Sequence, residues 1–329
     1  MPTDFLVGVD LGGTKIFTVL ADQSAEILSE VRLDTESDRG MNVVLGNVYR
    51  SIDKVMVDAG VASAQMAAIG VGAPGPLDTG TGVIHEAPNL GWRDVPLGRL
   101  LTERYSVPVL LDNDANLAAL GEKRYGAGRD AGDLVYITVS TGVGAGIIIN
   151  NKIHHGHSDA AGEIGHISVD PDGPECGCGS IGCLETLASG TALARQAKEL
   201  VASGSGQGIL ERAGGAIDNI SARTIGEAAA NGDAEAVRLI RQAGTCLGFA
   251  IANLVNLLNP SLIVIGGGVA RIGPILFDAI EVEVRHRTMP ASRKGLRIVP
   301  AALGDRSGVM GAIALAIEHL EYFPTPGVY

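Results

Sequence analysis

The sequence predicts a duplicated α/β fold. Strand-like segments alternate with helical ones along most of the 329 residues. Residues 5–10 run through a Gly/Thr turn into a second strand at 16–21, and residues 134–139 run through another such turn into a strand at 145–149. Two halves that each begin with strand, turn and strand indicate a repeated unit with a ligand between the two copies.

The remaining elements follow from local patterns. Short apolar, β-branched segments predict strands, and apolar residues at helical spacing predict helices. The longest helix should end at Asn259-Pro260, because proline cannot continue a helix, and the glycine-rich segment 203–215 is the predicted surface loop. Further strands are expected at 67–72, 107–111, 262–265 and 296–300, and helices at about 41–59, 97–105, 189–203, 222–230, 233–258 and 306–321.

Composition and charge exclude several classes of protein. Hydrophobic residues make up 46% of the chain, which is ample for sizeable cores. No apolar run of about 18 residues is present to span a membrane, and the start of the chain lacks the basic leader of a secretory signal, so a cytoplasmic protein is expected. The net charge of −12, with no block of Lys and Arg, predicts that nucleic acid is not a partner.

Three cysteines and a histidine predict a metal site. Cys176, Cys178 and Cys183 lie within eight residues, and His166 precedes the first of them by ten. Thiolates and imidazole are the ligands of tetrahedral Zn²⁺, and the intervening glycines let the backbone fold around an ion. Four protein ligands leave no open position, so a structural zinc is expected. The alternatives are a zinc knuckle that only pins a loop and a cluster that never binds metal.

Two carboxylates flank this predicted zinc site. Glu163 precedes His166 by three residues and Glu185 follows Cys183 by two, so a metal that orders the loop would also order both acids. The remaining cysteine is expected in an apolar helix as a core residue. His154, His155 and His157 form a histidine-rich run that could suggest a metal site, but an exposed turn after a strand explains the run equally well, so its members are predicted not to be ligands. These excluded residues are Cys246, His154, His155 and His157.

Three glycine-rich turns follow predicted strands. Asp10 ends the first strand before Gly12-Gly13-Thr14-Lys15, where backbone amides can approach phosphate and the acid can serve Mg²⁺. Thr141-Gly142 and Gly266-Gly267-Gly268 form two more turns of this kind. The first turn is not a Walker A loop, because it continues into a strand, and a dinucleotide fingerprint is absent at the start of the chain. Any one of the three turns has an ordinary tight turn as its alternative, but three in one chain favour nucleotide binding.

Polar residues close another apolar strand and open a helix. Asp112, Asn113 and Asp114 occupy this junction, where side chains converge at the carboxyl end of a sheet. Asp114 is well placed to be a general base, although one of the three is expected to cap the helix. Upstream, Asn89 either reads a hydroxyl or forms a turn with Gly91. Amides, carboxylates and an imidazole together are typical of a sugar site.

In their order along the chain, these motifs resemble the ROK family (repressors, open reading frames and sugar kinases), and within it the bacterial glucokinases. The likeness rests on Asp10 to Lys15, Gly72 to Asp78, Asn89 to Trp92, Asn113-Asp114, Glu163-x-Gly165-His166, Cys176 to Glu185 and Gly266 to Gly268. The resemblance implies an actin-like ATPase (ribonuclease H-like) fold of two α/β lobes with a central cleft. Residues 1–115 and a C-terminal helix at about 305–329 would form the N-terminal lobe, and 116–304 the C-terminal lobe with the zinc motif.

The resemblance also implies ATP-dependent phosphorylation of glucose at its 6-hydroxyl. Asp114 would be the base, and Mg²⁺ would lie near Asp10. His166 would bind zinc through one ring nitrogen and a sugar hydroxyl through the other. The implied sugar ligands are Asn89, Asn113, Asp114, Glu163, His166 and Glu185. The implied nucleotide contacts are Asp10, Gly12, Gly13, Thr14, Lys15, Thr141, Gly142, Gly267 and Gly268.

Several alternatives stay open at this point. The sugar could be N-acetylmannosamine, mannose or fructose, and polyphosphate could replace ATP. The family also contains sugar-responsive repressors, but these carry an added N-terminal helix-turn-helix domain, and a strand beginning at residue 5 leaves no room for one. An actin-like filament protein would have no use for a zinc site and hydroxyl-reading residues. A homodimer or homotetramer is expected from the family.

Overall fold

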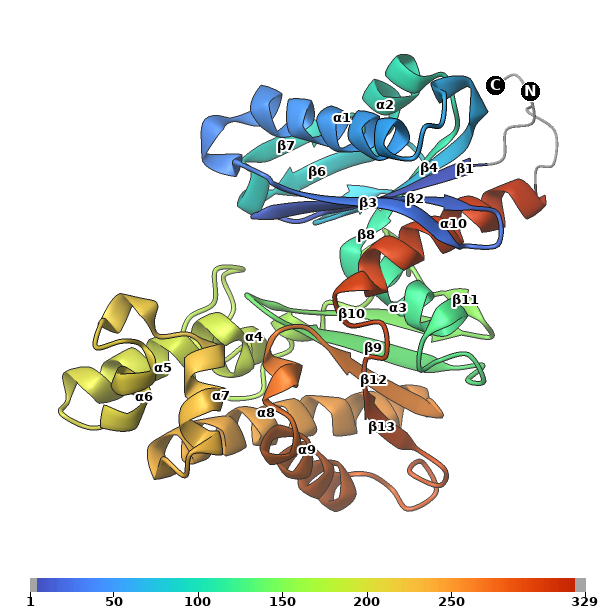
Figure 1. Ribbon diagram of the computed structural model, residues 1–329. Coiled ribbons are helices and arrows are strands. Elements are labelled where there is room, and N and C mark those ends of the chain that lie inside the picture. The colour runs from blue at the N-terminus through green and yellow to red at the C-terminus, as the bar shows by residue number, and fades with distance from the viewer. Residues whose placement is uncertain (1–4, 323–329) are drawn as a thin grey trace. The chain divides into compact units, whose positions relative to one another are not determined.

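The computed structural model describes residues 5–322 of the chain (Figure 1). These residues divide into two compact units. Unit 1 comprises the described residues of Met1–Asp130, Gly146–Ala161 and Ala302–Tyr329, and unit 2 comprises Ala131–Ala145 and Gly162–Ala301. Residues 1–4 and 323–329 of the expected N-terminal lobe lie outside the described part of the chain.

The first sheet has the strand order β3-β2-β1-β4-β8. Its strands are β1 (Phe5–Leu11), β2 (Lys15–Asp22), β3 (Ile27–Asp34), β4 (Met66–Ala73) and β8 (Val109–Asn113). The β1–β2 and β2–β3 pairs are antiparallel, and the β1–β4 and β4–β8 pairs are parallel. Asp10 pairs with Gly72, which pairs with Asp112, so the carboxyl ends of three parallel strands bring these two acids to one edge of the sheet.

The second sheet repeats this plan with the order β11-β10-β9-β12-β13. Its strands are β9 (Leu134–Val139), β10 (Val143–Ile149), β11 (Lys152–Ile153), β12 (Leu262–Gly266) and β13 (Arg297–Pro300). β9 and β12 are parallel, as are β12 and β13, while β10 and β11 are antiparallel. The predicted duplication is confirmed, because each sheet starts from a hairpin and adds two parallel strands in the same order.

Alternation along β1 divides the core of unit 1 into two layers. Val7 and Val9 face α1 (Met41–Asp58), where they pack with Val44. Leu6 points to the opposite face and packs with Ile313 of α10 (Ser307–Tyr322). Figure 1 shows α1 and α10 on opposite sides of this sheet. Each fully buried side chain of this size contributes roughly 1.5–3 kcal/mol to folding.

The return of the chain into unit 1 is fixed by a buried carboxylate. Glu122 lies on α3 (Asp114–Tyr125) and is fully buried. It accepts hydrogen bonds from the N–H groups of Ala302 and Leu303 at 3.1 and 2.8 Å and from the Ser307 hydroxyl at 2.8 Å. Because a buried carboxylate requires such partners, this cluster ties the start of α10 to α3. The helix α3, expected from residue 116 onward in the C-terminal lobe, therefore lies in unit 1.

Unit 2 is built around one long helix, α8 (Ala234–Leu258). Asp233 caps it by accepting a hydrogen bond from the Ala236 N–H at 2.8 Å, and Asn259 ends it in the left-handed conformation before Pro260. The helices packed around it are α4 (Leu184–Ala188), α5 (Gly190–Ala202), α7 (Ala222–Ala230) and α9 (Pro274–Arg287). Segment 203–215 is not a continuous loop, because α6 (Gln207–Arg212) forms within it and buries Ile209.

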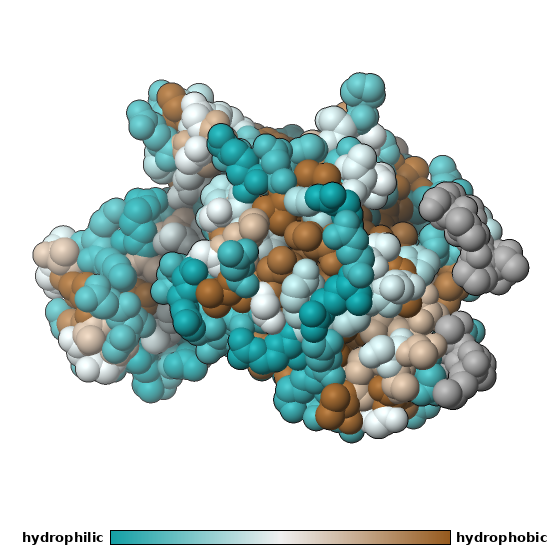
Figure 2. All heavy atoms as spheres, turned by 90° about the horizontal axis from the view of Figure 1, so that it is seen from above, coloured by the Kyte–Doolittle hydropathy of each residue, from teal (hydrophilic) through white to brown (hydrophobic). Residues whose placement is uncertain are grey.

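Unit 1 contains a third sheet that was not among the strands predicted from the sequence. It consists of β5 (Leu77–Asp78), β6 (Val83–Ala87) and β7 (Trp92–Val95), with α2 (Leu97–Tyr105) following it. The face drawn in Figure 2 is a mosaic in which polar side chains surround small apolar areas. Among residues 5–322, no helix has the length and apolar character that crossing a membrane requires.

Candidate functional site

The four predicted metal ligands come together in unit 2. The ligand atoms of His166, Cys176, Cys178 and Cys183 all lie within 4.8 Å of one another. Cys176 Sγ is 3.6 Å from His166 Nδ1, and the sulfurs of Cys178 and Cys183 are 3.7 Å apart. In a tetrahedral zinc site with Zn–S of about 2.3 Å, neighbouring ligand atoms are separated by about 3.5–3.8 Å. The cluster therefore fits a structural zinc ion.

The pKa values of two of these thiols are shifted in opposite directions. Hydrogen bonds from the Ser180 backbone and then from Cys176 lower the pKa of Cys178 to about 7. Burial and the neighbouring thiols instead raise the pKa of Cys183. Zinc binds thiolates, so an ion would hold both sulfurs deprotonated.

His166 presents its two ring nitrogens to different partners. Nδ1 faces the Cys176 sulfur, and Nε2 is 3.9 Å from Oε2 of Glu163, which is itself exposed. A metal on Nδ1 fixes the tautomer and leaves an N–H on Nε2. His166 and Glu163 thus offer a donor and an acceptor side by side, which is the pair that a hydroxyl group binds.

Glu185 is tied to the turn between β9 and β10. Its Oε2 accepts a hydrogen bond from the Val143 N–H at 2.9 Å. A Cβ at position 142 would lie 2.2 Å from the same oxygen, so this close approach requires Gly142. Glu185 therefore links the segment that carries the predicted metal ligand Cys183 to the residue that follows the Thr141-Gly142 turn.

A cavity of about 690 Å³ opens beside this turn within unit 2. Gly267, directly after β12, has φ +85° and would place a Cβ 2.3 Å from the Val139 carbonyl oxygen, so only glycine fits the turn that borders the cavity. The starts of α5 and α7 supply hydroxyl groups to the wall. The lining includes Thr141, Thr191, Ser221, Gly226, Gly268 and Ile272.

Sequence reasoning found only part of this lining. Thr141 and Gly268 were predicted as nucleotide contacts, whereas Thr191, Ser221 and Ile272 were missed. Their signal is the helix cap: Ser221 forms a capping box with Thr224, and Thr191 follows the cap Ser189. Two helix N-termini directed at one cavity favour an anionic or electron-rich ligand.

In unit 1, the predicted phosphate turn is a braced hairpin. The Gly12 N–H donates to the Lys15 carbonyl at 2.9 Å, and hydroxyls of Thr35 and Ser37 donate to the carbonyls of Gly12 and Gly13. The Gly12 amide is thus used inside the hairpin, which leaves those of Gly13 and Thr14 as candidates for phosphate. Lys15 is exposed beside them.

Asn89 lies next to the same hairpin. A Cβ at position 13 would come within 2.8 Å of the Asn89 Cβ. Asn89 occupies a 3₁₀ turn, Pro88–Leu90, and its side chain is exposed. The backbone at Asn89 therefore does form a turn, and the side-chain amide of Asn89 is exposed where a ligand can reach it.

Asp10 and Asp114 are neighbours in unit 1. Burial, and then the negative charge of Asp114, raise the pKa of Asp10 to about 7. A partly buried carboxylate next to a second acid is destabilised as an anion, and a bound divalent cation relieves both penalties. The pair fits Mg²⁺, which prefers oxygen ligands.

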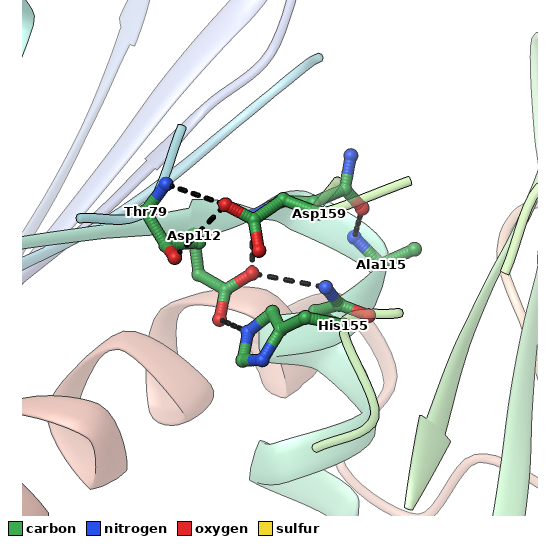
Figure 3. Close-up of polar contacts among 7 residues, drawn as sticks. Thr79, Asp112, Ala115, His155 and Asp159 are labelled. Atoms are coloured by element: carbon green, nitrogen blue, oxygen red, sulfur yellow. Dashed lines mark hydrogen bonds and ion pairs between the residues drawn. The ribbon is translucent and has the colours of Figure 1, made fainter. Parts of the chain in front are cut away.

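The junction of β8 and α3 places Asp114 in the first helical turn. Asn113 is the cap, and its Oδ1 accepts the Ala115 N–H at 2.9 Å. Asp112 is buried and bonded to His155, as Figure 3 shows, so it is directed away from the role of cap. Of the three residues at the junction, Asn113 is therefore the cap that the sequence expects.

The structure thus gathers the predicted residues into two groups. Unit 1 holds Asp10, Gly12, Gly13, Thr14, Lys15, Asn89, Asn113 and Asp114. Unit 2 holds Thr141, Gly142, Glu163, His166, Cys176, Cys178, Cys183, Glu185, Gly267 and Gly268.

Known proteins resemble the chain over most of its length. The chain is 41% identical to the glucokinase of Halalkalibacterium halodurans, with 94% of each chain covered. It is 33% identical to the xylose repressor of Caldicellulosiruptor bescii, where the match covers 97% of this chain and 79% of the repressor. A structure of a ROK family glucokinase from Streptomyces griseus, in complex with glucose and AMPPNP, superposes with a TM-score of 0.85 at 36% identity and covers 95% of this chain and 99% of that one.

The family model agrees with these relatives. The ROK family matches residues 6–319, which is nearly the whole described chain. Two sheets with the same strand order agree with the actin-like ATPase fold of that family. The chain belongs to the ROK family.

Proposed function

We propose that the protein transfers the γ-phosphate of ATP to the 6-hydroxyl of glucose, with Asp114 as the general base. The observation that carries this proposal is Asp114 in the first turn of α3, close to Asp10 and directly after the helix cap Asn113. The glucokinases with which the chain shares 33–41% identity support the choice of reaction.

Phosphoryl transfer of this kind needs no covalent bond to the protein, so the protein contributes by positioning the substrates and stabilising charge. The Asp114 carboxylate accepts the proton of the sugar 6-hydroxyl while the hydroxyl oxygen forms a bond to the γ-phosphorus. The bond between the γ-phosphorus and the bridging oxygen of ADP breaks at the same time, and ADP leaves. The Gly13 and Thr14 amides, together with those of Thr141 and Gly142, are proposed to hold phosphate oxygens. Mg²⁺ held near Asp10 would offset the charge of the transferring group.

We propose that the sugar is bound by two kinds of side chain. The amides of Asn89 and Asn113 can both donate and accept, whereas the carboxylates of Glu163 and Glu185 accept hydrogen bonds from hydroxyls. His166 adds a donor whose orientation the metal would fix. Two contacts beside the predicted zinc ligands support this proposal. Glu163 Oε2 lies 3.9 Å from His166 Nε2, and Glu185 accepts a hydrogen bond from the Val143 N–H.

The cavity beside Thr141 is the proposed adenosine site. Its volume of about 690 Å³ falls in the range of small-molecule pockets. Apolar groups such as Ile272 suit a purine face, and the hydroxyls of Thr191 and Ser221 suit its edge or the ribose. The proposal adds these three residues to the nucleotide contacts expected from the sequence.

A coupled assay of ATP consumption over a sugar panel tests the function. Glucose should give the highest kcat/KM among glucose, mannose, fructose and N-acetylmannosamine. A site that pairs its buried acceptors with hydroxyls discriminates by up to about 10⁴ against an analogue that leaves them unpaired. A higher value for an N-acetylated sugar or fructose would overturn glucose as substrate and keep a sugar kinase. Sugar binding without turnover of ATP would instead favour a regulator. The homodimer or homotetramer implied by the resemblance stays a prediction.

A further inference from the structure

Asp112 is a buried acid with a complete set of donors. Only 2% of its surface is exposed. Oδ1 accepts hydrogen bonds from the Asn113 N–H at 2.7 Å and from Asn116 Nδ2 at 2.9 Å, and Oδ2 lies 2.8 Å from His155 Nε2 (Figure 3). Because an unpaired buried carboxylate is strongly unfavourable, these three donors determine where the Asp112 side chain can sit.

Asn116 shows how firmly this carboxylate is held. Its amide is buried and directs Nδ2 at Asp112, while its own Oδ1 has no partner within residues 5–322. A buried acceptor without a partner costs free energy, so the orientation is set by the charge of Asp112. The network therefore spans the strand end, the cap and the first turn of α3.

His155 is held from a distant part of the chain. It follows β11, and the same segment is fastened a second time at Asp159, whose Oδ2 accepts hydrogen bonds from the Thr79 N–H at 3.0 Å and the Thr79 hydroxyl at 3.1 Å. Figure 3 shows the Thr79–Asp159 contact alongside the Asp112–His155 contact. All four residues belong to unit 1. The segment is thus fixed at two points, and the imidazole meets Asp112 with little freedom.

We propose that His155 is a positioning residue for the reaction: through Asp112 and Asn113 it holds Asp114 at the orientation needed to accept the proton. This inference rests on the proposed function of Asp114. His155 acts on Asp112 by donating a hydrogen bond to its carboxylate. Asp112 in turn accepts a hydrogen bond from the N–H of Asn113, the residue directly before the proposed base Asp114. A hydrogen-bond donor at the place of His155 Nε2 is required, because without it the buried Asp112 Oδ2 would lose the hydrogen bond that it accepts there.

Loss of the donor should therefore slow the chemistry while substrates still bind. Displacing a catalytic group by about 1 Å can cost about 10²-fold in rate. His155→Leu removes the donor at similar size, and His155→Asn keeps an amide that is too short to reach Asp112. His155→Gln restores a donor near the place of Nε2. His157→Leu is the matched control, because His157 is exposed on the same segment.

The experiment measures kcat and both KM values for the four variants, with their melting temperatures as a check of folding. His155→Leu and His155→Asn should lower kcat by about 10- to 100-fold with both KM values within about threefold of wild type. His155→Gln should recover most of kcat, and His157→Leu should match wild type.

Three results would overturn the positioning role. One is a kcat within twofold of wild type in a folded His155→Asn variant, another is an equal loss in His157→Leu, and the third is an effect confined to KM. If His155→Leu does not fold, His155→Asn and His155→Gln decide the question. A wild-type protein that shows no sugar-dependent turnover of ATP would overturn the proposed function itself, which separates the two failures.

Discussion

Glu185 accepts a hydrogen bond from the Val143 N–H, so a residue two positions beyond a predicted zinc ligand is bonded to the turn between β9 and β10. The sequence separation is 42 residues. Residues proposed for sugar recognition and for phosphate binding are therefore not independent within unit 2.

Gly142→Ala tests this link. The added methyl would lie 2.2 Å from Glu185 Oε2 and must displace the carboxylate or the turn. We expect kcat/KM for glucose to fall by at least about tenfold, which corresponds to about 1.4 kcal/mol of transition-state stabilisation. Gly46→Ala is the control, because open space surrounds that position on α1. Equal kinetics for both variants would show that Glu185 moves aside without consequence.

Asp114→Asn tests the general base. The amide cannot accept the hydroxyl proton, so kcat should fall by about 10² to 10⁴ while glucose binding, measured by calorimetry, persists. Asp58→Asn serves as control, since Asp58 is at the end of α1 and pairs with the exposed Lys54 on the same helix. Near-normal turnover in Asp114→Asn would exclude this residue as the base.

Cys178→Ser tests the metal site. Loss of one thiolate should release zinc and weaken glucose binding more than ATP binding, because the metal would orient His166 directly and Glu163 through its contact with His166. The measurements are zinc content by elemental analysis and the two dissociation constants. Cys246→Ser is the control thiol, which lies outside the cluster. Native protein that contains no zinc would contradict the assignment.

The His155–Asp112 pair predicts a pH-dependent stability. The hydrogen bond to Asp112, and after it the charges of Asp112 and Asp159, raise the pKa of His155 in the folded protein despite partial burial. A raised folded pKa means that the stabilisation is complete below the unfolded value of about 6.5 and is lost as the pH rises through the folded value. The difference in melting temperature between wild type and His155→Gln should therefore be larger at pH 6 than at pH 8.5.

The exposed His157 gives the control for this measurement. His157→Gln should follow wild type at both pH values, because its side chain is exposed on the same segment. A stability difference for His155→Gln that stays constant between pH 6 and 8.5 would mean that the proton on His155 contributes nothing to folding.

Much of the fold could be predicted from the sequence because its signals are local. The hairpins that open each half, and helices such as Ala222–Ala230, depend on periodicity and caps within a few residues. Ile27–Asp34 was missed because only Val31 is buried in it, so an edge strand with charged residues lacks a clear apolar pattern. The short strands β5 to β7 carry too few residues for a period to emerge.

In the candidate site, too, the features that depend on residues close in sequence could be predicted, and those that depend on distant residues could not. The zinc ligands lie close in sequence, and their spacing alone indicated the cluster that the structure contains. The partnership of His155 with Asp112 joins residues 43 apart, and the raised pKa of Asp10 depends on Asp114. Such pairs follow from strand order and burial, which no spacing rule encodes.

The hydrogen bonds from Ala302, Leu303 and Ser307 to Glu122 have a consequence for synthesis on the ribosome. The apolar layer formed by Leu6 and its neighbours on β1 and β2 is covered by α10, which is translated after every strand of this sheet. A nascent chain that has finished α3 still exposes this layer to water, and its Glu122 carboxylate still lacks the partners that Ala302, Leu303 and Ser307 supply. Unit 1 therefore cannot bury this layer until α10 has been synthesised, and until then the layer is an exposed apolar surface of the kind that promotes aggregation.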